Sequence, residues 1–200
     1  MIEALRNWFS KLCHFRAPLN EQTINHSAGL NSFLKGRSIW KQNIQSDNYI
    51  QSRKSCFKDA LPYFDFAIEK GYENAEVFSL RASCLDALGF YYEALDDYNK
   101  CVSKKPTRGV ADNYFRRALV KERLLDFEGA FDDLSQAISQ SKLLNEDNSF
   151  WNNHYKKMNC SSAAHFYEIW LDIMKTNYEN YKMDSVFAEN QKKLIKRRDF

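Results

Sequence analysis

A period of 34 to 36 residues constrains this chain more than any other feature of its sequence. Small residues recur at Ala60, Ala94 and Ala130, first 34 and then 36 positions apart. Three further series keep the same spacing: Phe57, Tyr91 and Phe127; Phe64, Tyr98 and Leu134; Ala67, Cys101 and Ala137. A fixed period of this size is typical of stacked helical repeats, in which each unit buries its apolar face only against its neighbours.

The clearest copy covers residues 75–106 and reads as two amphipathic helices joined at Gly89 and followed by Pro106. Two helices cross closely only where small side chains let the backbones approach. Ala82 and Ala94 supply such side chains, and bulkier residues at helical spacing fill the space around the crossing. The pattern therefore predicts a helical hairpin, with further hairpins on either side of it.

This order of residues resembles the tetratricopeptide repeat (TPR). In the clearest copy the matching residues are Phe78, Ala82, Gly89, Tyr91, Ala94, Tyr98, Cys101 and Pro106. In 111–142 they are Tyr114, Ala118, Phe127, Ala130, Leu134 and Ala137, with departures at Lys121 and Lys142. In 41–74 only the second helix matches, and Pro62 lies inside it, where proline can kink a helix. The resemblance implies an all-α solenoid that serves as an interaction scaffold.

We expect about three such repeats over 37–142, with capping helices at both ends. Residues 1–36 are expected to hold N-terminal capping helices, the second over 20–34 and ending before Gly36. The first, over 1–16, carries an apolar face, for which membrane-surface attachment and partner contact are alternative roles. Residues 143–200 are expected to form a degenerate fourth hairpin or capping pair, in which Ala163 lies 33 residues after Ala130, and a basic tail.

Composition narrows the class of protein. Aromatic residues make up 15% of the chain, and no stretch is apolar enough to cross a bilayer. The five cysteines are scattered, which indicates thiols in a reducing compartment and a cytoplasmic protein. Basic charge is concentrated in residues 192–200, so the body lacks the footprint of a nucleic-acid-binding surface.

No arrangement of residues predicts catalysis, a cofactor or a metal. The sequence lacks nucleotide-binding glycine loops, HExxH and nucleophile elbows. His154, Cys160 and His165 have separations that differ from those of zinc sites. The acidic pairs 96–97 and 132–133 recur at one repeat position, and we interpret them as solvated helix faces. We therefore expect a non-enzymatic protein.

Binding is expected on the concave face, which the first helices of successive hairpins line in such a stack. The predicted contact residues are Gln45, Tyr49, Glu76, Ser79, Leu80, Ser83, Asp86, Asp112, Phe115, Arg116, Leu119, Glu122 and Arg123. Exposed Phe115 and Leu119 beside two arginines would suit a peptide or helix with apolar anchors and an acidic group. The alternative, equally supported, is that both pack against a neighbouring hairpin or a terminal helix.

Three functions follow from these expectations. The first is a scaffold whose groove takes a peptide or partner helix, and the second is a chaperone or immunity-like protein that sequesters one secreted or toxic partner. The third is nucleic-acid or anionic-membrane association through the basic run 192–198. The family comparison disfavours an adaptor for the C-terminal tails of heat-shock chaperones. The carboxylate-binding places of such adaptors read Gln45, Tyr49, Leu80, Asp112 and Arg116 here, of which only Arg116 fits.

Overall fold

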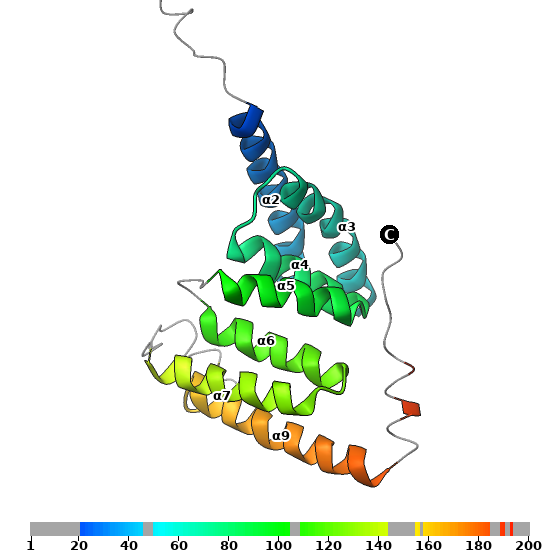
Figure 1. Cartoon of the computed structure of the whole chain (residues 1–200), viewed down its shortest axis with the longest axis vertical. Helices are drawn as coiled ribbons and strands as arrows, with labels where there is room; N and C mark the ends of the chain where they lie inside the picture. Colours follow the sequence, from blue (N-terminus) through cyan, green and yellow to red (C-terminus); the bar gives the residue numbers. More distant parts are fainter. Residues whose placement is uncertain are drawn as a thin grey trace, which may run out of the picture.

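The computed structural model describes residues 21–45, 50–104, 109–143, 155–156, 158–184, 189–190 and 193. Within these ranges every regular element is helical. The helices are α2 (Glu21–Gln45), α3 (Ile50–Glu69), α4 (Ala75–Leu88), α5 (Tyr91–Ser103), α6 (Val110–Arg123), α7 (Phe127–Leu143) and α9 (Ala163–Met183). They are stacked along the long axis of the molecule from α2 at one end to α9 at the other (Figure 1).

Consecutive helices pair as hairpins, and the hairpins stack. Helices α2 and α3, α4 and α5, and α6 and α7 pack closely within each pair. Helix α4 also packs on α3, α6 on α5, and α9 on α7, so each first helix lies against the second helix of the preceding hairpin (Figure 1). This is the arrangement of an α-solenoid, and it confirms the predicted fold class.

The repeated small and bulky positions form the core. Ala60, Ala94 and Ala130 are all fully buried. The same is true of the series Phe64, Tyr98 and Leu134 and of the series Ala67, Cys101 and Ala137. The period seen in the sequence is therefore the period of the buried seam between the hairpins.

Residues in the left-handed conformation follow several of the helices. Gly71 follows α3 with φ +77° and Gly89 follows α4 with φ +88°. At the second of these turns Phe90 N–H donates to the carbonyl of Leu85, which satisfies a carbonyl that the helix end would otherwise leave free. Leu125, 36 residues after Gly89, holds the same conformation at φ +67° without being glycine.

The first hairpin differs from the prediction. A separate helix over 20–34 and a turn at Gly36 are wrong, because α2 continues through Gly36 to Gln45. Gly29 and Gly36 are buried against α3. A Cβ on Gly36 would lie 2.9 Å from the Phe64 ring, and one on Gly29 would lie 3.0 Å from the Ala67 carbonyl oxygen. The glycines thus allow close helix packing inside α2, and the domain boundary predicted at 36/37 falls within a helix.

Two other expectations concern Pro62 and the last hairpin. Pro62 lies inside α3, which continues on both sides of it. The helix predicted around Ala163 is present as α9, and Ser162 caps its N-terminus by accepting from His165 N–H. Helix α9 lies on α7 in the place of a first helix, not of the second helix that the spacing from Ala130 suggested. Its expected partner around residues 150–158 and the helix expected over 1–16 fall wholly or mostly outside the described residues.

Candidate functional site

Buried ion pairs hold the second hairpin together. Arg81 of α4 donates from Nε and Nη2 to the two carboxylate oxygens of Asp97 on α5, at 2.6 and 2.7 Å. It also donates from Nη1 to Asp65 on α3 at 2.9 Å. Asp97 is 1% exposed, and burial raises its pKa despite the opposing effect of Arg81. One guanidinium therefore links three helices from two hairpins.

The third hairpin repeats this arrangement 36 residues later. Arg117 donates to both carboxylate oxygens of Asp133 on α7, at 2.8 and 2.6 Å, and to Asn99 on α5 at 3.0 Å. Lys121 adds a second cation, with its Nζ 2.9 Å from Asp133 and 3.1 Å from the Gly129 carbonyl oxygen. The interpretation of both acidic pairs as solvated is therefore wrong for Asp97 and Asp133, since bidentate arginine bonds permit their burial.

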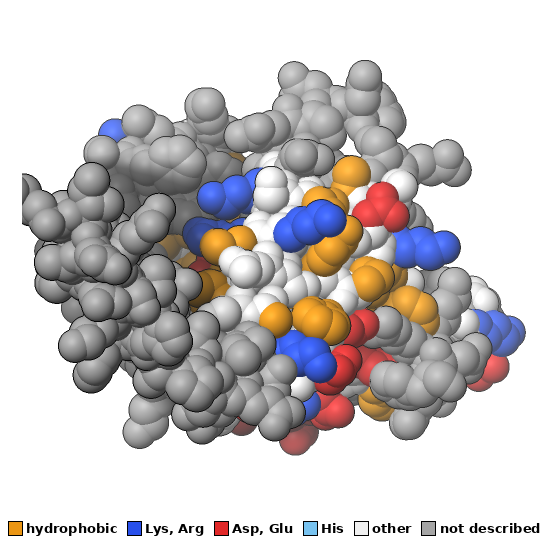
Figure 2. All heavy atoms as spheres, turned by 90° about the horizontal axis from the view of Figure 1, so that it is seen from above, with side chains coloured by type: hydrophobic (Ala, Val, Ile, Leu, Met, Phe, Trp, Pro, Cys, Tyr) orange, Lys and Arg blue, Asp and Glu red, His pale blue; other side chains and the backbone are white. Residues whose placement is uncertain are grey.

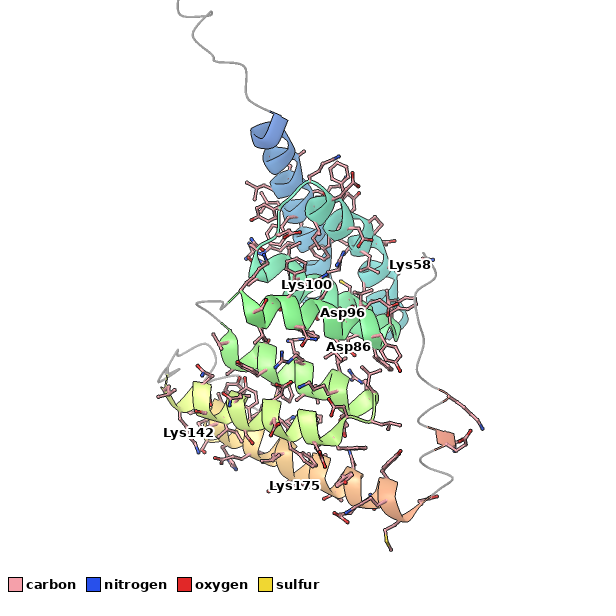
Figure 3. All side chains as sticks on the ribbon, viewed as in Figure 1. Lys58, Asp86, Asp96, Lys100, Lys142 and Lys175 are labelled. Carbon is pink, nitrogen blue, oxygen red and sulfur yellow. The ribbon has the colours of Figure 1, made fainter. Side chains whose placement is uncertain are left out.

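The candidate binding surface lies on the face that α4 and α6 share. Ser79 donates to the Asn113 side chain at 2.7 Å, and Arg116 donates to the Ser83 hydroxyl at 3.4 Å. At the C-terminal ends of the two helices Arg123 forms an ion pair with Asp86, which is labelled in Figure 3. These three contacts join the first helices of two neighbouring hairpins. The predicted contact residues on α4 and α6 thus lie together, and several of them bond to one another.

The same polar row extends to both neighbouring first helices. Arg37 of α2 lies 3.0 Å from the carboxylate of Glu76 on α4. Asn177 of α9 donates to Glu122 on α6 at 2.7 Å. We call this row, from α2 through α4 and α6 to α9, the inner face. It is the face on which the sequence predicted partner contacts.

Electrostatics within the inner face hold Arg116 firmly charged. Its Nε lies 2.7 Å from Asp112, four residues earlier on α6. Burial alone lowers the pKa of Arg116, but Asp112 and Tyr98 raise it above the usual arginine value. Burial raises the pKa of Asp86, although Arg123 and Arg116 oppose that shift. Arg116 is thus already bonded to a carboxylate of its own chain.

Phe115 is not the exposed anchor that one prediction made of it. It is only 9% exposed, and its ring centroid lies 5.2 Å from that of Tyr167 and 5.6 Å from that of Trp170, both on α9. Leu119 is partly buried against the same cluster. The alternative, packing against a terminal helix, is confirmed, because α9 covers this side of α6.

The remaining predicted contact residues fall elsewhere. Gln45 is the last residue of α2, and Tyr49 lies outside the described residues. The first-hairpin contacts were predicted on the assumption that the first helix spans them, and that register is wrong because α2 begins and ends earlier. Leu80 is partly buried against the core of the first two hairpins.

Among the residues that the structure describes, no group of three or more His, Cys, Asp or Glu side chains could hold a metal ion. Of the three residues weighed as ligands, His154 lies outside the described residues, and His165 Nδ1 accepts from Ser161 N–H at 3.1 Å. None of the helices assigned above combines the length and apolarity needed to cross a membrane.

The architecture is a TPR-like α-solenoid of helical hairpins. It is similar to the solved structure of the Arabidopsis OM64 TPR domain, with a TM-score of 0.52 and 19% sequence identity, covering 74% of this chain and 97% of that chain. No family model matches the sequence. In sequence the chain is 30% identical over 80 residues, or 40% of its length, to the Hsp70-Hsp90 organizing protein of Triticum aestivum. That match spans 13% of the wheat protein.

Sequence reasoning missed three sets of residues. The first is the pair of arginines, whose 36-residue spacing from Arg81 to Arg117 is visible once the repeats are aligned. The second consists of the asparagines Asn113 and Asn177, which bond between first helices but carry no recognisable spacing signal. The third consists of Ile169 and Ile173 on α9, which are 38% and 43% exposed. The face of α9 on which these isoleucines lie follows only from how α9 packs on α6.

Proposed function

We propose that this chain is a non-enzymatic protein-interaction domain that holds a peptide or helix of a partner protein on its inner face. The observation that carries the proposal is the row of polar side chains shared by α4 and α6, in which several carboxylates and guanidinium groups remain accessible. The side chains of Glu76 and Asp112 are 47% and 45% exposed, and those of Arg116 and Arg123 are 39% and 40% exposed. Such groups give orientation and specificity to a bound polypeptide.

The pairing of these groups also favours one kind of ligand over another. Arg116 occupies one of the carboxylate-binding places of chaperone-tail adaptors, but Asp112 already bonds to it at 2.7 Å. A ligand carboxylate at this place would have to displace Asp112 and meet its negative charge. We therefore propose that the partner is recognised through an internal segment rather than through a free C-terminal carboxylate, unlike what the name of the wheat relative could suggest.

A matched pair of charge-reversed variants tests the proposal. The inner-face variant combines Glu76→Lys with Asp112→Lys. The control combines Asp96→Lys on α5 with Asp132→Lys on α7, two exposed acids on second helices with the same total charge change (Figure 3). Both variants are compared with the wild type in quantitative affinity capture, and a captured partner is then purified and titrated by calorimetry.

We expect the inner-face variant to bind the purified partner at least about tenfold more weakly, a loss of about 1.4 kcal/mol, while the control binds as the wild type does. Equal affinity of all three proteins would contradict the assignment of the surface. A loss of affinity in the control variant alone would indicate that the partner binds to the second helices. Unfolding followed by circular dichroism shows whether either variant has lost its fold.

A further inference from the structure

The contacts of α9 define its place in the stack residue by residue. Where α6 faces α4, it uses Asn113, Arg116 and Arg123. Where α9 faces α6, it uses Tyr167, Trp170 and Asn177. Each α9 residue follows its α6 counterpart by 54 positions. Helix α9 therefore packs on α6 through the same helix positions that α6 uses to pack on α4.

The same offset identifies the residues of α9 that would receive a further helix. Phe115 on α6 corresponds to Ile169, and Leu119 corresponds to Ile173. Phe115 is 9% exposed beneath α9, whereas Ile169 and Ile173 are 38% and 43% exposed. The places where α6 receives α9 thus recur on α9, as two isoleucines one turn apart that no described helix covers.

At the other end of the stack, the outer face of α2 carries residues with the spacing of those by which α6 packs on α4. Gly36 faces Phe64, the counterpart of Tyr98, and so takes the place of Ala82 in the second hairpin. In this register the residues of α2 that would contact a preceding first helix are Asn31, Leu34, Ser38 and Lys41. Their spacing of three, four and three residues equals that of Asn113, Arg116, Val120 and Arg123. All four α2 residues are exposed, with Leu34 at 48%.

The two ends also differ in charge. Residues 22–45 contain no acidic residue and carry Lys35, Arg37 and Lys41. Figure 2 looks onto this end of the molecule and shows hydrophobic side chains with Lys and Arg side chains among them, and Asp and Glu side chains beside them. On α9 the exposed Asp172 lies between the two isoleucines in sequence, three residues before the exposed Lys175, and has no ion pair with any residue placed in the structure. A cationic helix with an apolar residue complements this surface.

We propose that a second copy of this chain seats α2 on α9, so that copies associate head to tail and continue the stack. Leu34 of one copy then packs on Ile169 and Ile173 of the next, and its lysines face Asp172. The contact is heterologous, so it leaves one free α2 and one free α9 at the ends of every oligomer. One helix pair buries a small area, and the association is therefore weak and concentration-dependent.

The experiment is sedimentation equilibrium of the full chain from about 10 μM to about 1 mM, a range that covers weak contacts. We expect the mean mass of the wild type to rise with concentration. Leu34→Glu and Ile173→Glu should each lower the association constant at least tenfold. Met183→Glu, at a position 86% exposed on α9 but outside the proposed contact, should leave it unchanged.

A mixture of the two variants separates this proposal from its competitors. The Leu34→Glu chain keeps an intact α9 and the Ile173→Glu chain keeps an intact α2, so an equimolar mixture should form dimers and nothing larger. A monomeric wild type at every concentration would overturn the proposal, as would association that survives Leu34→Glu, which would indicate contact between two α9 helices. A monomeric mixture would also overturn it. Circular dichroism and the parallel variants Leu34→Ser and Ile173→Ser show whether a loss reflects unfolding.

Discussion

The first hairpin and the two that follow bring their helices together in different ways. Helices α4 and α5, like α6 and α7, carry alanines at the repeated small positions and are joined by a partly buried arginine that donates to a buried aspartate on the second helix. Helices α2 and α3 pack through two glycines, Gly29 and Gly36, and among their described side chains Ser32 donates a hydrogen bond to the Tyr63 carbonyl.

The difference shows that the period records a geometry and not one set of interactions. Glycine lets α2 approach α3 so closely that aromatic rings fill the remaining space, as Phe33 does against Phe64 and Tyr72, with centroids 6.3 and 5.1 Å away. The later hairpins add polar bonds between their two helices, and these bonds also reach back to the preceding hairpin. The first hairpin therefore depends on shape, and the later ones depend on both shape and charge pairing.

The largest expected effect is the loss of a buried acid. Asp97→Ala leaves Arg81 with only the partly exposed Asp65, and we expect the free energy of unfolding to fall by about 3 kcal/mol or more. Urea denaturation measures this free energy of unfolding. Asp96→Ala is the control, because Asp96 is the exposed neighbour of Asp97 on the same helix. A loss below about 1 kcal/mol, the value of a surface ion pair, would show that the pair adds little to the second hairpin.

A smaller effect is expected from adding one methyl group to the first hairpin. In Gly36→Ala the new Cβ would lie 2.9 Å from the Phe64 ring and 3.0 Å from Tyr63 Cβ, so the Phe64 ring or the helices must shift. Overpacking of this kind lowers the free energy of unfolding by about 1–3 kcal/mol. The better helix propensity of alanine offsets up to about 1 kcal/mol of that loss. We expect a lower thermal midpoint for Gly36→Ala and none of that loss for Ser38→Ala on the exposed face. A stabilised Gly36→Ala would contradict glycine-dependent packing.

This contrast also explains how much the sequence could predict. The aligned alanines and aromatics were enough to predict the repeats, because positions buried at a fixed spacing are restricted to small or apolar residue types. Helix α2 was misplaced, because glycine within a helix is indistinguishable in sequence from glycine that ends one. Gly89 and Gly36 illustrate the two cases.

The candidate site was predicted less completely for a related reason. Several polar residues of α4 and α6 contact one another on one face, and helical spacing alone decides which residues of a helix share a face. The burial of Phe115 depends on Tyr167 and Trp170 of α9, 52 and 55 residues further along the chain, and no local pattern reports a contact of that range. The burial of Asp97 is of the same kind, because it depends on an arginine from another helix.

The smallest effect tests the two later hairpins against each other. Arg81 bonds to the carboxylate of Asp65, whereas Arg117 bonds to the amide of Asn99, 34 residues further on. Around Arg117 and Lys121 there is one acid for two cations, so Asn99→Asp supplies a missing charge, and Asp65→Asn removes one from Arg81. We expect unfolding free energies to rise and fall by about 0.5 kcal/mol respectively, since both sites are partly exposed. In 1 M salt the two shifts should shrink toward zero. Shifts of the same sign would mean that the arginines are held by geometry alone, independent of the charge of the third partner.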